Sequence, residues 1–90
     1  MPKVELNTDD EKKISEILHY VWDPAGIAGE PACRDEYDGY VPGVLLKVRH
    51  EFMTEVLLAD YLEQTAIKAF GRPYGASVRT AKILWRAFRQ

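Results

Sequence analysis

The chain has 90 residues, of which 47% are hydrophobic and 29% charged, and its formal net charge is -2. This length suits one domain spanning residues 1–90, and the composition is that of a globular protein and not of a disordered one. No apolar run approaches the roughly 20 residues that cross a bilayer, and we expect no secretory signal because residues 1–5 lack its apolar stretch. The net charge argues against general nucleic-acid binding. Cys33 is the only cysteine, so an internal disulfide is excluded and we expect a cytoplasmic protein.

The charge is distributed unevenly along the chain. Residues 1–40 carry ten acidic and four basic side chains, whereas residues 72–90 carry five basic and no acidic ones. Such asymmetry either pairs one end of the fold with the other or steers a charged partner. In so small a domain we expect pairing within the fold.

The first helix is predicted from its capping box. Thr8 and Glu11 have the spacing in which a hydroxyl and a carboxylate cap the first turn reciprocally. Apolar residues then follow at helical spacing from Ile14. The helix should end near Trp22, because Pro24 biases the residue before it away from the α region.

The second predicted helix starts at Pro31, which fits a first turn. Its apolar stripe comprises Tyr37, Tyr40, Val41, Val44, Leu45 and Val48. Pro42 interrupts that stripe, and a proline inside a straight helix costs about 3 kcal/mol. We therefore expect the second helix to be kinked near Pro42, or split there into two short helices.

Two further helices complete an all-α bundle of about four. Thr54 is the expected N-cap of the third helix, and Gly71 marks its end. Ser77 is the expected N-cap of the fourth, in which apolar residues again recur at helical spacing. No segment alternates as a strand would.

The third predicted helix carries more apolar surface than one stripe requires. Its expected core face comprises Leu58, Ala59, Leu62, Ala66, Ala69 and Phe70. Val56 and Ile67 lie on nearly the opposite side, with Leu57 on a flank. Either this helix occupies the centre of the bundle, which we favour, or it forms a homodimer through Val56 and Ile67.

The residues that could support catalysis or metal binding form no recognisable pattern. Cys33 is a candidate nucleophile, with His19 and His50 as candidate bases, but no nucleophile motif surrounds it. His19 and Asp23 could join the acids of residues 35–38 around a metal, although their spacing matches no metal motif. We expect no enzyme, no metal site and no cofactor.

The fourth helix has a basic stripe opposite its apolar face. The stripe consists of Arg79, Lys82, Arg86 and Arg89. Such a row could contact nucleic-acid phosphates, but it is more often a solvated face of a helix. Nucleic-acid binding through this helix is therefore the alternative function.

Two acidic and aromatic stretches are the most distinctive in the chain. Residues 22–27 read Trp-Asp-Pro-Ala-Gly-Ile, and residues 35–42 read Asp-Glu-Tyr-Asp-Gly-Tyr-Val-Pro. This pattern resembles a group of short, uncharacterised, all-helical bacterial proteins, over roughly residues 14–70. The resemblance implies a bacterial origin and a compact helical fold, and it implies no activity.

The same two stretches supply the candidate site. We expect the loop after Trp22 to pack against residues 35–40, with the Asp23 carboxylate accepting loop amides. The candidate contact residues are Trp22, Asp23, Asp35, Glu36, Tyr37, Asp38 and Tyr40. For these two stretches we favour a structural role over recognition by a partner, because single aromatic residues at helical spacing usually belong to the core. The leading hypothesis is a non-catalytic protein-binding or accessory module, for example an immunity-type protein that masks a basic enzyme. We expect its partner to be another protein and not a membrane.

Overall fold

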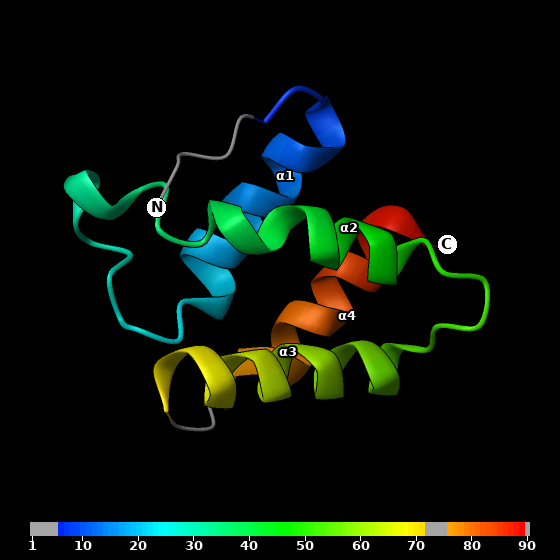
Figure 1. Cartoon of the computed structure of the whole chain (residues 1–90). Coiled ribbons are helices and arrows are strands. Elements are labelled where there is room, and N and C mark those ends of the chain that lie inside the picture. Colours follow the sequence, from blue (N-terminus) through cyan, green and yellow to red (C-terminus); the bar gives the residue numbers. More distant parts are fainter. Residues whose placement is uncertain (1–5, 72–75, 90) are drawn as a thin grey trace.

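The computed structural model describes residues 6–71 and 76–89, and these ranges contain helices and turns but no strand. The helices are α1 (Asp9–Ile17), α2 (Val41–Val48), α3 (Glu55–Phe70) and α4 (Ala76–Phe88), with a π-helical turn η1 (Leu18–Trp22) and two 3-10 turns, η2 (Pro31–Cys33) and η3 (Asp38–Tyr40). In Figure 1, α3 lies along the lower edge of the molecule and α2 lies above it. The predicted all-α fold is confirmed.

The helix ends follow local sequence signals. Thr8 and Glu11 form the predicted capping box at the start of α1. Thr54 caps α3 by accepting a hydrogen bond from the Leu57 amide, and Gly71 ends that helix in the left-handed region at φ 79°. A glycine adopts this conformation without the steric cost of a Cβ atom. All three ends were predicted from the sequence, and all three are confirmed.

The C-terminal end of the first helix widens into a π-helical turn. The Asp23 amide donates to the carbonyl of Leu18, five residues earlier, at 2.9 Å. Asp23 itself adopts a left-handed conformation with φ 37°, so the helix stops after Trp22 as predicted. Short π-helical turns of this kind are often found at functional sites.

The second helix is split as expected, but less of it is α-helical than predicted. The segment from Pro31 forms the short turns η2 and η3, and α2 begins only at Val41. Pro42 lies in the first turn of α2, where its missing N–H breaks no intrahelical hydrogen bond. The second helix is bent by 25°, which agrees with the predicted kink or split.

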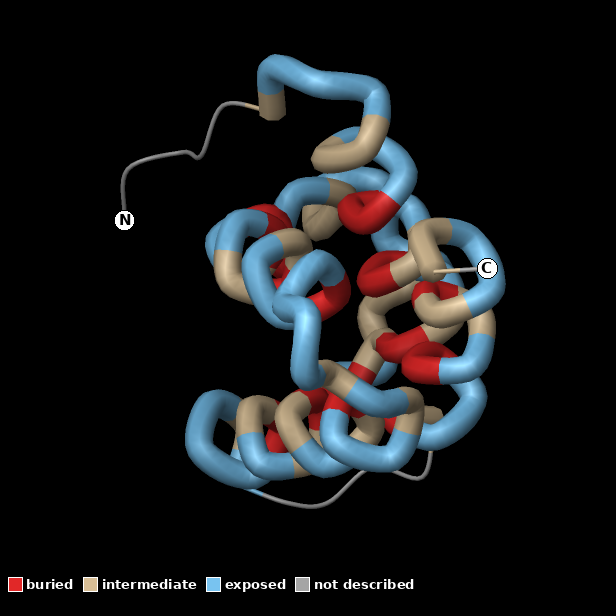
Figure 2. The backbone as a smooth tube through the Cα atoms, turned by 90° about the vertical axis from the view of Figure 1, so that its right-hand side faces the viewer, coloured by how far each residue is buried: buried red, intermediate tan, exposed pale blue. Residues whose placement is uncertain are grey.

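The core lies where the inner faces of the helices meet (Figure 2). Its buried apolar residues are Ile14, Leu18, Trp22, Tyr37, Val41, Val44, Val48, Leu58, Leu62, Ala66, Ala81 and Leu84. Where α2 approaches α3, a Cβ atom on Gly43 would lie only 2.7 Å from the Tyr61 hydroxyl. No helix in the described ranges is long and apolar enough to cross a membrane.

Two predictions about the third and fourth helices are wrong. α3 does not occupy the bundle centre, because Val56 and Ile67 are exposed to solvent and only one side of the helix is buried. On that side, Leu58 and the other residues of the predicted core face are buried or half-buried, except Ala69, which is exposed. Ser77 is not an N-cap, since it lies inside α4 and is buried.

Candidate functional site

The Asp23 carboxylate organises the loop that follows η1. Its two oxygens accept hydrogen bonds from the amides of Ile27 at 2.8 Å and Ala28 at 3.0 Å. The Tyr37 hydroxyl donates to Asp23 at 2.7 Å and accepts from the Ala25 amide at 2.9 Å. The predicted contact between the loop and residues 35–40 is therefore confirmed, and so is the predicted capping role of Asp23.

The aromatic residues of the candidate site form an internal cluster. The Trp22 ring lies 5.6 Å from Tyr37, 6.0 Å from Tyr40 and 6.3 Å from Phe70, between ring centroids. The indole N–H donates to Ser77 at 3.2 Å, and this hydroxyl in turn donates to Glu63 at 3.2 Å.

The burial of the aromatic site residues favours a structural role for them over contact with a partner. Trp22 and Tyr37 are buried and Tyr40 is half-buried, so the first two offer no surface to a partner in this structure. They are correctly placed together by the sequence analysis, but as a core that supports the loop. Phe70, from the end of α3, was not predicted to join them.

A second polar link joins the turn η3 to α1. The Ser15 hydroxyl donates to the Asp38 carboxylate at 2.5 Å and accepts from the Arg34 guanidinium at 3.0 Å. Asp38 is 8% exposed, so its carboxylate is buried where it accepts the Ser15 hydrogen bond. Ser15 was missed by the sequence analysis, although Ser15, His19 and Trp22 have the spacing of a second buried stripe on the first helix.

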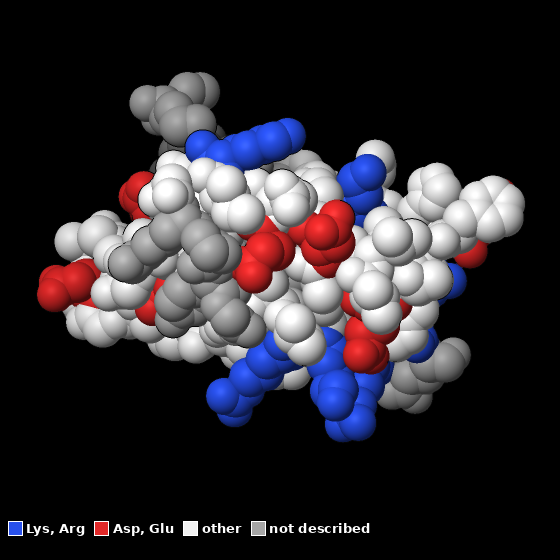
Figure 3. Space-filling view, turned by 90° about the horizontal axis from the view of Figure 1, so that it is seen from below, with Lys and Arg blue, Asp and Glu red and all other residues white. Residues whose placement is uncertain are grey.

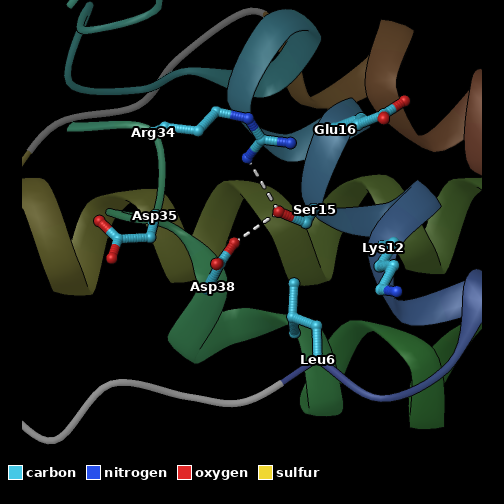
Figure 4. Close-up of a pocket in the computed structure, with 7 residues that line it drawn as sticks. All are labelled: Leu6, Lys12, Ser15, Glu16, Arg34, Asp35 and Asp38. Carbon is cyan, nitrogen blue, oxygen red and sulfur yellow. Dashed lines mark hydrogen bonds between the residues drawn. The ribbon is translucent and has the colours of Figure 1, made fainter. Parts of the chain in front are cut away.

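A hollow of about 410 Å³ opens beside this link. Its lining residues are Leu6, Lys12, Ser15, Glu16, Arg34, Asp35 and Asp38. Figure 4 shows that they come from α1, from Leu6 ahead of that helix and from the turns around η2 and η3, with Asp38 and Arg34 both directed at Ser15. Three acids and two bases therefore surround one polar hollow.

The remaining candidate acids lie on the surface. Asp35 and Glu36 are exposed on the turn between η2 and η3. The structure thus separates the predicted site into a buried scaffold, made of Trp22, Asp23 and Tyr37, and an exposed acidic rim.

The basic stripe of α4 is only partly available to a ligand. Arg79, Lys82 and Arg86 are exposed, whereas Arg89 is half-buried and donates to the carbonyls of Val48 and His50. Figure 3 shows basic side chains at two opposite edges of the underside, with acidic side chains between them and at one end. Arg89, one of the four predicted phosphate contacts, therefore binds the end of α4 to the end of α2.

The candidate catalytic and metal-binding residues are dispersed. His19 is buried, and its Nδ1 atom has no hydrogen-bond partner among the described residues; the Thr80 hydroxyl shares both properties. Cys33 is a half-buried free thiol. Within residues 6–71 and 76–89, no group of three or more His, Cys, Asp or Glu side chains is arranged to hold a metal ion.

Burial and the Asp23 hydrogen bond raise the pKa of Tyr37 above its ordinary value of 10.0. The unfolded chain therefore releases this proton at lower pH than the folded protein does, and stability is lost as the pH rises above about 10. We expect the free energy of unfolding to fall with pH by up to about 1.4 kcal/mol per unit more steeply in the wild type than in Tyr37→Phe. Denaturant titrations between about pH 9 and 11.5 measure this.

The exposed Tyr20 provides the control for this titration. Tyr20→Phe should keep the steep pH dependence of the wild type. Parallel stability curves for the wild type and Tyr37→Phe would show that Tyr37 ionises equally in both states.

The chain matches no family model, no curated protein and no solved structure. The resemblance to short helical bacterial proteins therefore stays a prediction.

Proposed function

We propose that this protein is a non-catalytic protein-binding module whose contact surface is an acidic face beside the hollow. This acidic face consists of Glu16, Asp35, Glu36 and Asp38. The observation that carries the proposal is the hollow itself, where the Asp38 carboxylate is fixed by Ser15 at 2.5 Å and borders an open volume of about 410 Å³. A carboxylate held in this way can bind a cation without first losing conformational entropy.

The chemistry of the acidic face supports a basic partner. A lysine or arginine side chain entering the hollow would meet the carboxylates of Asp38, Glu16 and Asp35. These three acids outnumber the two basic side chains of the lining, Lys12 and Arg34. Basic anchor residues that fill pockets are common binding hot spots, and acidic surfaces accelerate association with basic proteins. An immunity-type protein that covers the basic surface of an enzyme is one specific form of this function.

The architecture supports a preformed surface. The loop between η1 and η3 is tied internally by Asp23 and Tyr37 and rests on the buried Trp22. Its acids therefore stand on a scaffold whose own hydrogen bonds are satisfied, and binding would require little rearrangement.

The test compares two variants of equal charge. With the protein as bait in an extract of its native host, Asp35→Asn with Glu36→Gln should lower the affinity for the captured basic protein at least tenfold. The loss should lie mainly in the association rate and should shrink at high salt. Glu51→Gln with Glu55→Gln, on the α2–α3 side, should bind as the wild type does.

Two outcomes would contradict the proposal. Equal losses in both double variants would mean that only the total charge matters. The other outcome has three parts: Asp35→Asn with Glu36→Gln keeps its affinity, Arg79→Gln with Lys82→Gln loses it, and nucleic acid is recovered with the bait. This outcome would favour the alternative function through α4.

A further inference from the structure

The outer side of α3 carries apolar residues that nothing in the described chain covers. Val56 is 78% exposed, Leu57 52% and Ile67 38%. In Figures 1 and 2, α3 lies at the edge of the molecule with the other helices on its inner side. Exposed apolar clusters of this kind commonly mark contact sites between proteins.

The exposed positions on one side of α3 have an internal symmetry, while the exposed Ala69 lies on another side of the helix. Between residues 55 and 68 they are Val56, Leu57, Asp60, Gln64, Ile67 and Lys68. These six residues, named here the α3 face, pair off about the level of Leu62: Asp60 with Gln64, Leu57 with Ile67, and Val56 with Lys68. At 100° per residue they lie within an arc of about 120°.

From this symmetry we propose that the α3 face binds the α3 face of a second copy, with the two helices antiparallel. A two-fold axis at the level of Leu62 would make each contact occur twice, as a closed symmetric dimer requires. The arrangement buries the exposed apolar side chains without leaving a surface open to a third copy.

The side chains of the α3 face complement themselves in this arrangement. On one side of the contact, Val56 meets Ile67 of the second copy. On the other side, Leu57 packs on the methylene stem of the second copy's Lys68, a common use of long basic side chains. In the middle, Asp60 accepts a hydrogen bond from the Gln64 amide of the second copy.

The charges of the α3 face permit the approach. Asp60 and Lys68 are its only charged members, so the face is neutral and each ammonium group can reach the other copy's carboxylate. The remaining acid near this side, Glu63, is half-buried and accepts a hydrogen bond from Ser77 at 3.2 Å. Two copies of the α3 face can therefore meet without repulsion between like net charges. A basic partner would gain nothing from a neutral face, so the charge of the α3 face favours a second copy.

The size of the α3 face sets the expected affinity. Six residues a side is well below the roughly 20–30 residues of a standard interface. We therefore expect a weak, concentration-dependent dimer with a dissociation constant of about 10 µM or higher. The proposed dimer does not depend on the acidic face. That face lies on α1, on the turn between η2 and η3, and on η3.

The test is sedimentation equilibrium from about 10 µM to about 1 mM protein. The wild type should pass from monomer to dimer over this range. Val56→Glu should remain a folded monomer throughout, because the side chain is exposed in the monomer but would be buried in the dimer. Ile67→Glu should do the same. Val78→Glu, at an exposed apolar position on α4, is the matched control and should dimerise normally.

A charge exchange tests the antiparallel register. Lys68→Glu alone should raise the dimer dissociation constant at least tenfold, and adding Asp60→Lys should restore it. A wild type that stays monomeric at about 1 mM would overturn the proposal, as would a Val56→Glu variant that dimerises normally or a Val78→Glu variant that does not. Failure of the double exchange to restore dimerisation would overturn the antiparallel pairing.

Discussion

Trp22→Ala is expected to lower the free energy of unfolding by about 3–5 kcal/mol, the largest effect of any substitution considered for this protein. The indole is fully buried and is surrounded by Tyr37, Tyr40 and Phe70. Its removal leaves a cavity among three aromatic rings, which cannot all collapse into the space. It also deprives the buried Ser77 hydroxyl of its indole donor.

Denaturant unfolding followed by far-ultraviolet dichroism measures this loss. Small domains have only about 5–15 kcal/mol of stability in total, so the variant should be partly unfolded near room temperature if the wild type lies at the low end. Trp85→Ala, which removes a half-buried indole at the other end of the core, should cost about half as much. A loss below about 1 kcal/mol for Trp22→Ala would show that the aromatic cluster does not stabilise the fold.

The features that the sequence predicted correctly are those with local causes. A capping box, an N-cap threonine and a left-handed glycine act within one turn of the chain, so Thr8, Thr54 and Gly71 could be assigned from spacing alone. Asp23 belongs to the same class, because a carboxylate before a proline finds the next free amides within five residues.

The candidate site was predicted in its residues but not in its exposure. Tyr37 was assigned both to the apolar stripe of the second helix and, with Asp35 and Asp38, to a contact site. In the structure Tyr37 and Asp38 are buried, and this burial depends on contacts between residues 14–23 positions apart, such as Ser15 with Asp38 and Asp23 with Tyr37. A helical period cannot show which side of a turn faces a distant helix.

The position of the third helix could not be predicted from its sequence either. Its apolar residues surround the helix, a pattern that fits both a central helix, which we favoured, and an interface helix. Only the position of α3 at the edge of the molecule distinguishes the two, since Val56 and Ile67 then face solvent. The sequence also placed Ser77 at a helix start, because serine is a common N-cap, whereas its hydroxyl is needed inside α4 between Trp22 and Glu63.

Asp23→Ala is expected to lower the free energy of unfolding by about 2–4 kcal/mol. Three donors lose their charged acceptor: the amides of Ile27 and Ala28 and the Tyr37 hydroxyl. Hydrogen bonds to a charged group contribute about 1.5–3 kcal/mol each, and partial exposure lets water replace some of that loss. Alanine also tolerates the left-handed φ of 37° less well than aspartate does.

Asp23→Asn and Tyr37→Phe divide this loss into its parts. The asparagine keeps one oxygen for Ile27 and Tyr37 and loses the acceptor for Ala28, so Asp23→Asn should cost about half as much as the alanine variant. Because Asp23 and Tyr37 share a hydrogen bond of 2.7 Å, the double variant Asp23→Ala with Tyr37→Phe should cost less than the sum of the two single variants. Thermal melts of the four proteins give this coupling. Strict additivity would mean that the two side chains act independently, and that the loop between them is held by its backbone turns and by the aromatic core alone.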